Sequence, residues 1–382
     1  MNVFDYIEKN KDRYIDFWVN ICKLEGNSHN KSDVNSVVDY IEKFAVSEGF
    51  SCTRYSFDNA ADYIVIDANP DSEKGHIYIA HSDTVFDKGS FGDEAVKISG
   101  DKIYGPGVID CKGGIAVALL SMKALCENGY NKHLRLIITS DEEVDNSLAK
   151  SEGIDIIKTM SAGFKSAFCC EVGKEGEILV ARSGIIRLTI EVKGKAAHSG
   201  IAYFDGVNAI EEASQKIIRI QKSSEKDGIT YSCNLITGGE RINIVAPKCS
   251  FQVDIRVKCA EDKEKALSVV KEIVNTDYTG GTHSTFNIDS ERMPMEKTNG
   301  NIALFEIIKE VGHKYQIEKI DNYCTSGGGS DAAYSVIAGV PTVCGIGTTG
   351  DFCHTTKEYA DIDSLEKRAK LISQTILSSS PR

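Results

Sequence analysis

The sequence has 382 residues, of which 41% are hydrophobic, and its formal net charge at pH 7 is −12. This acidic balance argues against a nucleic-acid or anionic-membrane surface and favours small solutes as partners. The length and the hydrophobic content predict a globular protein of two or three domains.

The first twenty residues mix charges with apolar residues at helical spacing and lack the unbroken apolar stretch of a signal peptide. No later segment is apolar over the length needed to cross a membrane. Twelve cysteines are scattered without a CxxC pair, which is typical of reduced thiols rather than of a disulfide framework. We therefore expect a cytoplasmic protein without a membrane partner.

The first half of the chain alternates predicted strands with predicted helices. Compact apolar runs predict strands covered on both faces, at Ile77 to Ala80, Leu134 to Thr139 and Ala167 to Cys170. The segment from Ile115 predicts a helix that ends at Gly129. This alternation predicts an α/β domain with a mixed, mainly parallel sheet and helices on both faces.

From about Ser183 the pattern changes to strict alternation of apolar and polar residues, which predicts a strand with one wet face. The elements that follow give the order β-α-β-β-α-β of a ferredoxin-like unit. They are predicted at Val207 to Lys222, Tyr231 to Ile236, 250–257, Asp262 to Asn275 and Thr282 to Ile288. The α/β pattern returns after Arg292, so we predict a domain of residues 183–292 inserted into a domain of residues 1–182 and 293–382.

Two segments place metal-ligating residue types directly after a predicted strand. In HSDTV, His81 and Asp83 stand two residues apart, so Asp83 can hold the second ring nitrogen of His81. In SDEEVDN, Glu142 and Glu143 lie at the carboxyl edge where open α/β sheets place their sites. Taken singly, these segments also suit a hydrogen-bonded turn and a solvated helix cap.

The loop YGPGVIDCKGG presents Asp110 just before a predicted helix. A phosphate-binding loop is a poor alternative, because the spacing of G-x-x-x-x-G-K-[ST] is absent and Asp110 would repel a phosphate. A nucleotide-binding oxidoreductase is also disfavoured, since no G-x-G-x-x-G follows a strand with the required downstream acid. The glycines suit a loop that holds a carboxylate at a defined angle.

Glu171 follows the third predicted strand directly, and His354 lies ahead of a final helix. Two histidines and three or four carboxylates, converging from separate strand ends, are the donors that a pair of divalent ions needs. We therefore predict two bound metal ions, with zinc as the preferred ion. The donor types leave cobalt and manganese open as alternatives.

Nearly the whole chain resembles the di-zinc aminoacylase/carboxypeptidase family of clan MH peptidases, which includes glutamate carboxypeptidase, acetylornithine deacetylase and succinyl-diaminopimelate desuccinylase. The resemblance is closest to the glutamate carboxypeptidase branch. It rests on HSDTV, YGPGVIDCKGG, SDEEV, GKAAHSG, RINIVAP, GGGSDAAY and CHTTKEYADIDSL, in this order.

The resemblance implies that Asp110 bridges the two ions. The other implied ligands are His81 and Glu171 at one ion, and Glu143 and His354 at the other.

Glu142 is the general base that the resemblance implies, and Asp83 belongs to the same catalytic group. Metal coordination lowers the pKa of water to about 7, so a bridging hydroxide is expected at neutral pH. Glu142 would then pass the proton to the leaving nitrogen.

In the inserted domain, His198 of GKAAHSG suits an ordinary turn on sequence alone. The resemblance implies that it reaches the substrate carbonyl in a partner subunit, with the inserted domain forming a homodimer contact. Arg256 lies on the polar face of a predicted strand and matches the family arginine that grips the substrate carboxylate. The same pocket would be lined by Asn243, Gly327, Gly328 and Gly329.

Cys111, next to Asp110, is interpreted as a packing residue, whereas Glu171 carries information about the substrate. By the resemblance, glutamate at this ligand favours carboxypeptidases and deacylases, whose substrates have a free carboxylate beside the scissile bond.

We therefore expect a metal-dependent hydrolase that cleaves an amide bond in small peptides or N-acyl amino acids. Alternatives are an aminopeptidase-like di- or tripeptidase and an acetylornithine- or succinyl-diaminopimelate-type deacylase. A non-catalytic ligand-binding dimer is disfavoured because every expected ligand and Glu142 are present.

Overall fold

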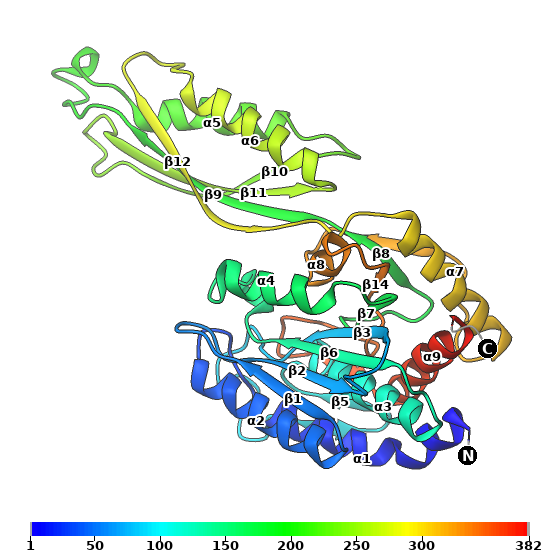
Figure 1. The fold of residues 1–382 in the computed structure, drawn as a ribbon. Helices are drawn as coiled ribbons and strands as arrows, with labels where there is room; N and C mark the ends of the chain where they lie inside the picture. Colours follow the sequence, from blue (N-terminus) through cyan, green and yellow to red (C-terminus); the bar gives the residue numbers. More distant parts are fainter. Residues whose placement is uncertain (1, 380–382) are drawn as a thin grey trace. The chain divides into compact units, whose positions relative to one another are not determined.

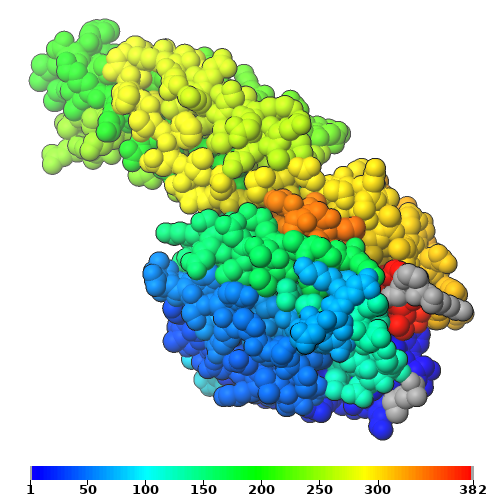
Figure 2. Space-filling model, viewed as in Figure 1, coloured from blue at the N-terminus to red at the C-terminus, as the bar shows by residue number. Residues whose placement is uncertain are grey.

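The computed structural model describes residues 2–379, and within them the chain divides into two compact units (Figure 1). Of the described residues, the larger unit comprises 2–181, 297–326 and 330–379, and the smaller unit comprises 182–296 and 327–329. The larger unit's surface is therefore built from both early and late parts of the chain, as the blue-to-green and gold-to-red atoms of Figure 2 show.

The larger unit is organised around a mixed sheet with the strand order β1-β2-β6-β3-β7-β14-β8-β13. Its four central strands, β6, β3, β7 and β14, run parallel, whereas β1, β2 and β8 pair with antiparallel neighbours. The strand bounds are β1 Ser51–Tyr55, β2 Tyr63–Ala68, β3 Lys74–His81, β6 His133–Thr139, β7 Ser166–Cys169, β8 Ile178–Arg182, β13 Tyr323–Ser326 and β14 Thr342–Cys344.

Helices cover both faces of this sheet: Figure 1 shows α4 and α8 on one face and α1, α2, α3 and α9 on the other. The first helix begins with a capping box between Asn2 and Asp5, which satisfies two backbone donors. The helix bounds are α1 Val3–Lys23, α2 Lys31–Ser47, α3 Lys112–Glu127, α4 Lys150–Ser161, α7 Asn299–Lys314, α8 Ala332–Ile337 and α9 Asp363–Ser379, with a 3₁₀ turn η1 at Glu142–Val144.

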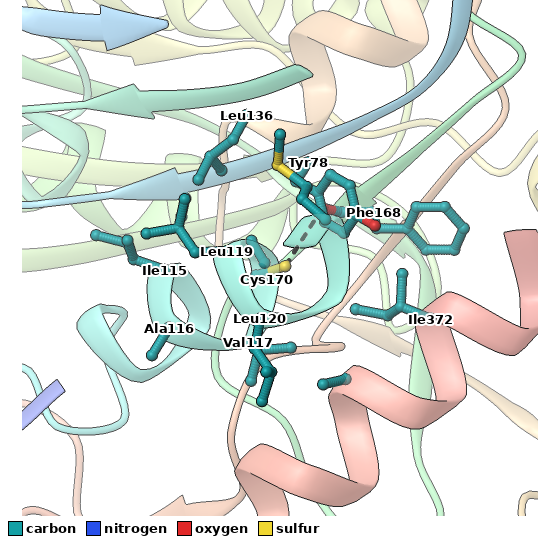
Figure 3. Packing of buried hydrophobic residues seen from close by; sticks show 14 of the residues in the cluster. Tyr78, Ile115, Ala116, Val117, Leu119, Leu120, Leu136, Phe168, Cys170 and Ile372 are labelled. Atoms are coloured by element: carbon teal, nitrogen blue, oxygen red, sulfur yellow. Dashed lines mark hydrogen bonds between the residues drawn. The ribbon is translucent and has the colours of Figure 1, made fainter. Parts of the chain in front are cut away.

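The main core lies between α3 and the sheet. Every residue from Lys112 to Met122 is buried, and the apolar side chains of this stretch pack against the central strands and α9 (Figure 3). Gly114 brings α3 very close to the strands, because a Cβ atom added there would lie 1.9 Å from the carbonyl oxygen of Cys170. This close packing fixes the start of α3, which follows Asp110.

A second, smaller sheet of the larger unit has the order β15-β16-β5-β4. Its bounds are β4 Lys97–Ser99, β5 Lys102–Tyr104, β15 Gly350–Asp351 and β16 Tyr359–Asp361. Because β16 pairs with β5, a segment near residue 355 lies beside the loop that presents Asp110, about 240 residues earlier in the chain.

The smaller unit is an antiparallel sheet of order β10-β11-β9-β12 that packs against α5 and α6. Its chain order is β-α-β-β-α-β, the ferredoxin-like topology. The alternation predicted for β9 is visible from Ile186 to Lys193, where inward residues are buried and outward residues are exposed or half-buried. The bounds are β9 Gly184–Lys193, η2 Tyr203–Asp205, α5 Ala209–Lys222, β10 Thr230–Gly238, β11 Lys248–Val257, α6 Ala260–Asn275 and β12 His283–Arg292.

The predicted fold class is thus confirmed, with element ends shifted by a few residues. One grouping differs from the predicted domain limits: Gly327–Gly329 belong to the smaller unit, although they follow residue 293. The carbonyl of Gly327 accepts a hydrogen bond from Arg256, and Gly329 lies against Arg292 and Ile185. These contacts attach the glycine loop to the smaller unit.

Among the described residues, no helix is both long and apolar enough to cross a lipid bilayer. The twelve cysteines all lie within the described part of the chain, and each is a free thiol.

Candidate metal centre

Three of the predicted segments meet because they follow neighbouring parallel strands. The strand β3 lies between β6 and β7, with His81 in register with Thr139 and Ile79 in register with Cys169. The carboxyl ends of the three strands therefore form one edge of the sheet. His81 ends β3, the Glu142–Val144 turn follows β6, and Glu171 follows β7.

The other two predicted ligands come from loops at the same edge. Asp110 directly precedes Cys111, the N-cap residue of α3, and the peptide bond between these two residues is cis. His354 lies between β15 and β16 with a φ of 61°, a left-handed conformation that is uncommon for residues other than glycine. Left-handed backbone conformations at residues other than glycine, such as that of His354, concentrate at functional sites.

The structure brings the five predicted ligands into one cluster around Asp110. Asp110 Oδ1 lies 3.0 Å from His81 Nε2, and its Oδ2 lies 3.2 Å from His354 Nε2. Beyond these contacts, Glu143 Oε2 is 3.1 Å from His354 Nε2, and Glu171 Oε1 is 3.9 Å from His81 Nε2.

This arrangement fits a pair of divalent ions. Each oxygen of Asp110 faces a different histidine, so the carboxylate has the orientation that a bridging ligand needs. On each side the donors are one imidazole nitrogen and one further carboxylate, which are ligand types that zinc accepts. Four of the five side chains are largely buried, and His354 is the exception. Burial strengthens the attraction of these groups for a cation.

The pKa values of these side chains reflect the crowding of charge. Hydrogen bonds to Asp110 and Glu143 raise the pKa of His354 to about 11. Burial and the charge of Asp110 raise the pKa of Glu143 to about 8. Burial would raise the pKa of Asp110, but hydrogen bonds to His354 and His81 lower it below the usual range. Cation binding to these side chains would therefore be coupled to the release of protons.

Asp83 fixes both His81 and the turn that carries the two glutamates. His81 Nδ1 lies 3.1 Å from the main-chain oxygen of Asp83 and 3.3 Å from its carboxylate. The same carboxylate accepts the backbone N–H groups of Glu142 and Glu143, at 3.3 and 3.2 Å. It also accepts the Ser28 hydroxyl at 2.6 Å. Sequence reasoning missed Ser28, since it lies 55 residues away and no motif marks it.

A buried network below the edge positions the Glu142–Val144 turn. Asp141 accepts the hydroxyl of Tyr63 and, through its other oxygen, the backbone N–H groups of Leu148 and Ala149. The hydroxyl of Thr139, the last residue of β6, donates to Asp331 at 2.7 Å. Asp141 was only part of a quoted motif in the sequence, so its positioning role comes from the structure alone.

Glu358 is a second residue that sequence reasoning missed. It is fully buried and accepts the backbone N–H groups of Ile109 and Asp110, at 3.0 and 3.3 Å. Burial raises the pKa of Glu358 to about 7. Its position four residues after His354, inside the quoted segment CHTTKEYADIDSL, was the available signal.

In the smaller unit, His198 and Asn243 lie on adjacent segments. An isolated antiparallel β-bridge pairs the backbone of His198 with that of Ile244. The backbone N–H of Ser199 donates to the carbonyl of Asn243 at 3.0 Å. His198 is exposed, and its Nδ1 accepts the backbone N–H groups of Gly200 and Ile201. In the neutral ring the proton is therefore on Nε2, where it can be donated to a carbonyl oxygen.

Arg256 lies on the polar face of β11, as predicted, but its guanidinium already has partners. It forms a two-point contact with Asp254, at 2.6 and 2.9 Å, and donates to the carbonyl of Gly327 at 3.2 Å. Asp254 thus holds the arginine in a fixed orientation. The substrate-binding roles of Arg256, Asn243 and the Gly327–Gly329 loop stay predictions.

Comparison with known proteins gives a family match over most of the chain. The model of peptidase family M20/M25/M40 matches residues 77–378. Carboxypeptidase G2 from Pseudomonas sp. (strain RS-16) is 26% identical over 369 residues, covering 94% of this chain and 87% of that protein. An acetylornithine deacetylase from Buchnera aphidicola subsp. Schizaphis graminum is 22% identical, covering 91% and 92%.

Solved structures share the fold. Aminopeptidase PepT from Bacillus cereus superposes with a TM-score of 0.79 at 22% identity, covering 96% of this chain and 98% of that chain. The M20 family metallo-carboxypeptidase Sso-CP2 from Sulfolobus solfataricus superposes with a TM-score of 0.76 at 14% identity, covering 95% and 98%. At these identities the likeness concerns the fold alone.

Proposed function

The chain belongs to peptidase family M20/M25/M40 and is a metal-dependent hydrolase, and on this premise we propose that it cleaves an amide bond beside a free carboxylate, in small peptides or N-acyl amino acids, with two zinc ions. The membership confirms the predicted family and enzyme class. The observation that carries the finer proposal is Asp110, which faces His81 through one oxygen and His354 through the other.

The proposed ligands of one ion are His81, Asp110 and Glu171. Those of the second ion are Asp110, Glu143 and His354. When bound, such ions lower the pKa of a coordinated water and polarise the scissile carbonyl. Cobalt and manganese are the alternative ions, because the same donor types accept them.

Glu142 is the proposed general base. Its backbone N–H is held by Asp83, and it immediately precedes the proposed ligand Glu143, so its carboxylate belongs to the same short turn. The carboxylate takes a proton from the attacking water as the new C–O bond forms, and it returns that proton to the nitrogen as the C–N bond breaks. Asp83 is the residue that holds both Glu142 and His81 in position.

The smaller unit supplies the proposed contacts to the substrate. Arg256, oriented by Asp254, offers its guanidinium to the carboxylate beside the scissile bond. His198, with its ring proton on Nε2, is suited to donate to the substrate carbonyl.

We also propose that the protein forms a homodimer through the smaller unit and that it is located in the cytoplasm. The edge strand β10 exposes Leu235 and Ile236 at 64% and 54% of their surfaces. Exposed apolar side chains on an unpaired sheet edge favour pairing with another chain. Sedimentation of the wild type and of a Leu235→Glu/Ile236→Lys variant tests this: the wild type should be dimeric and the variant monomeric.

A Glu142→Gln variant tests the chemistry. Glutamine keeps the size of the side chain but cannot accept the proton, so kcat should fall at least about 100-fold while KM changes little. A matched control is Glu152→Gln, an exposed glutamate on α4, which should keep wild-type activity. Full activity of the Glu142→Gln protein would contradict the assignment.

A substrate panel and elemental analysis test the rest of the proposal. Hydrolysis of N-blocked dipeptides without hydrolysis of free tripeptides supports the carboxypeptidase-like function, and the reverse pattern identifies a tripeptidase. Purified protein should contain two metal ions per chain, and chelation should remove both the ions and the activity.

A further inference from the structure

Cys111 lies inside the cluster of proposed ligands rather than in the apolar core alone. One ligand atom from each of His81, Cys111 and Glu171 lies within 4.8 Å of the other two, and all three residues are buried. The Cys111 sulfur also accepts the backbone N–H of His81 at 3.3 Å. The residue interpreted from sequence as packing is therefore a neighbour of one proposed ion site.

The spacing of His81 and Glu171 is close to that of two donors to one zinc ion, and the Cys111 sulfur lies within 4.8 Å of both. Two donors of a tetrahedral zinc ion lie roughly 3.3 to 3.8 Å apart when their bonds are about 2.0 to 2.3 Å long. His81 Nε2 and Glu171 Oε1 already lie 3.9 Å apart.

Other buried cysteines near this edge have different partners. The Cys170 thiol donates to the carbonyl of Phe168 at 3.6 Å within the core (Figure 3). The sulfurs of Cys169 and Cys344 both contact the hydroxyl of Ser330. Among the described residues, Cys111 is the cysteine that groups with a histidine and a carboxylate.

We propose that Cys111 is a further donor to the ion held by His81 and Glu171, and that its sulfur makes this site prefer thiophilic ions such as zinc and cadmium over manganese. The inference rests on the proposed two-ion function. Soft thiolate ligands select zinc, whereas carboxylate oxygens accept manganese more readily. The site of His81, Glu171 and Cys111 would then select thiophilic ions, whereas the site of Glu143 and His354 would also accept manganese.

Cobalt substitution of the full-length protein gives a readout that is independent of activity. A cobalt–sulfur bond produces a charge-transfer band in the near ultraviolet, so the wild type loaded with two Co²⁺ ions should show this band. Cys111→Ser should lose the band, and the control Cys170→Ser should keep it. Cys111→Asp, which replaces the sulfur donor with an oxygen donor, should also lack it.

Metal competition provides the second measurement. Cys111→Ser should bind zinc at the tighter site at least about 10-fold more weakly, the scale seen when a metal site loses a supporting group. Its manganese affinity should change by less than about threefold. A cobalt-loaded wild type without the band, or a Cys111→Ser protein that keeps it, would overturn the proposal.

These outcomes are separate from those of the proposed function. If the band is absent but amide hydrolysis still depends on Glu142, the cysteine assignment fails and the hydrolase assignment stands. If the band is present but no amide substrate is cleaved, the cysteine assignment stands and the hydrolase assignment fails. If Cys111→Ser does not fold, the band in the wild type and in Cys111→Asp decides the question.

Discussion

Replacing Lys216 with methionine tests how a buried charge pair supports the smaller unit. Lys216 and Glu212 are one turn apart on α5, both side chains are fully buried, and Lys216 Nζ lies 2.8 Å from Glu212 Oε1. The same ammonium donates to the carbonyls of Ile273, Val274 and Thr276, at the end of α6. Lys216 thus caps one helix while it neutralises a carboxylate on another.

Methionine preserves most of the volume of Lys216 but leaves the Glu212 carboxylate without its counter-charge. Breaking a buried ion pair by removing one partner costs about 3–5 kcal/mol. The α6 carbonyls lose a donor as well, and an unsatisfied buried acceptor adds about 1–3 kcal/mol. Three donors, the N–H groups of Tyr278 and Thr279 and the Thr279 hydroxyl, still reach Glu212, so we expect the lower half of the combined range, about 4–6 kcal/mol.

Two spectroscopic probes separate the units. The chain has a single tryptophan, Trp18, which is buried in α1 of the larger unit. In urea unfolding, Lys216→Met should move the circular-dichroism transition of the smaller unit to lower denaturant. The free energy of unfolding obtained from Trp18 fluorescence, which reports on the larger unit, should change by less than about 0.5 kcal/mol.

The matched control is Lys222→Met, an exposed lysine in the last turn of the same helix. Its free energy of unfolding should stay within about 0.5 kcal/mol of the wild type. A Lys216→Met protein that loses less than about 1 kcal/mol would refute the reasoning, because the buried charge would then be tolerated without its partner.

Three further predictions concern the larger unit. Asp83→Asn replaces an acceptor of two backbone N–H groups and a partner of His81, so kcat of the metal-saturated enzyme should fall about 10- to 100-fold while the fold persists; unchanged steady-state kinetics would contradict this. Gly114→Ala should destabilise the protein by about 1–3 kcal/mol in denaturant unfolding, because the new Cβ would collide with the Cys170 carbonyl; equal stability would show that α3 can shift freely. Burial lowers the pKa of His76 to about 4, so between about pH 6.5 and 4 the unfolded ring takes up a proton that the folded ring does not. Stability should therefore decrease as the pH falls through this window, by up to about 3 kcal/mol, and His76→Phe should remove that part of the pH dependence of the unfolding free energy.

The fold and most of the proposed ligand set could be predicted because the relevant signals are local in sequence. The apolar runs that became β3, β6 and β7 distinguish a covered parallel sheet from the alternating, half-exposed strand β9. Since parallel strands end at one edge, residues that directly follow such runs, as Glu142 and Glu171 do, were expected to meet. Their convergence near His81 also needed β3 to lie between β6 and β7, a strand order that the structure supplies.

The supporting residues could not be predicted because they act through contacts between distant segments. Ser28 reaches Asp83 across 55 positions, and Glu358 reaches the Asp110 backbone across 248. No periodicity encodes such contacts, since they depend on which loops the packed elements bring together.

The sequence by itself determined which donor types the chain offers and that they lie at strand ends. Only the tertiary structure decided that the two oxygens of Asp110 face different histidines, and that the sulfur of Cys111 lies beside His81. The physical reason is that side-chain direction at a loop depends on how the loop packs. For Asp110 and Cys111, that packing is set by α3 against the strands and by Glu358 on the loop backbone.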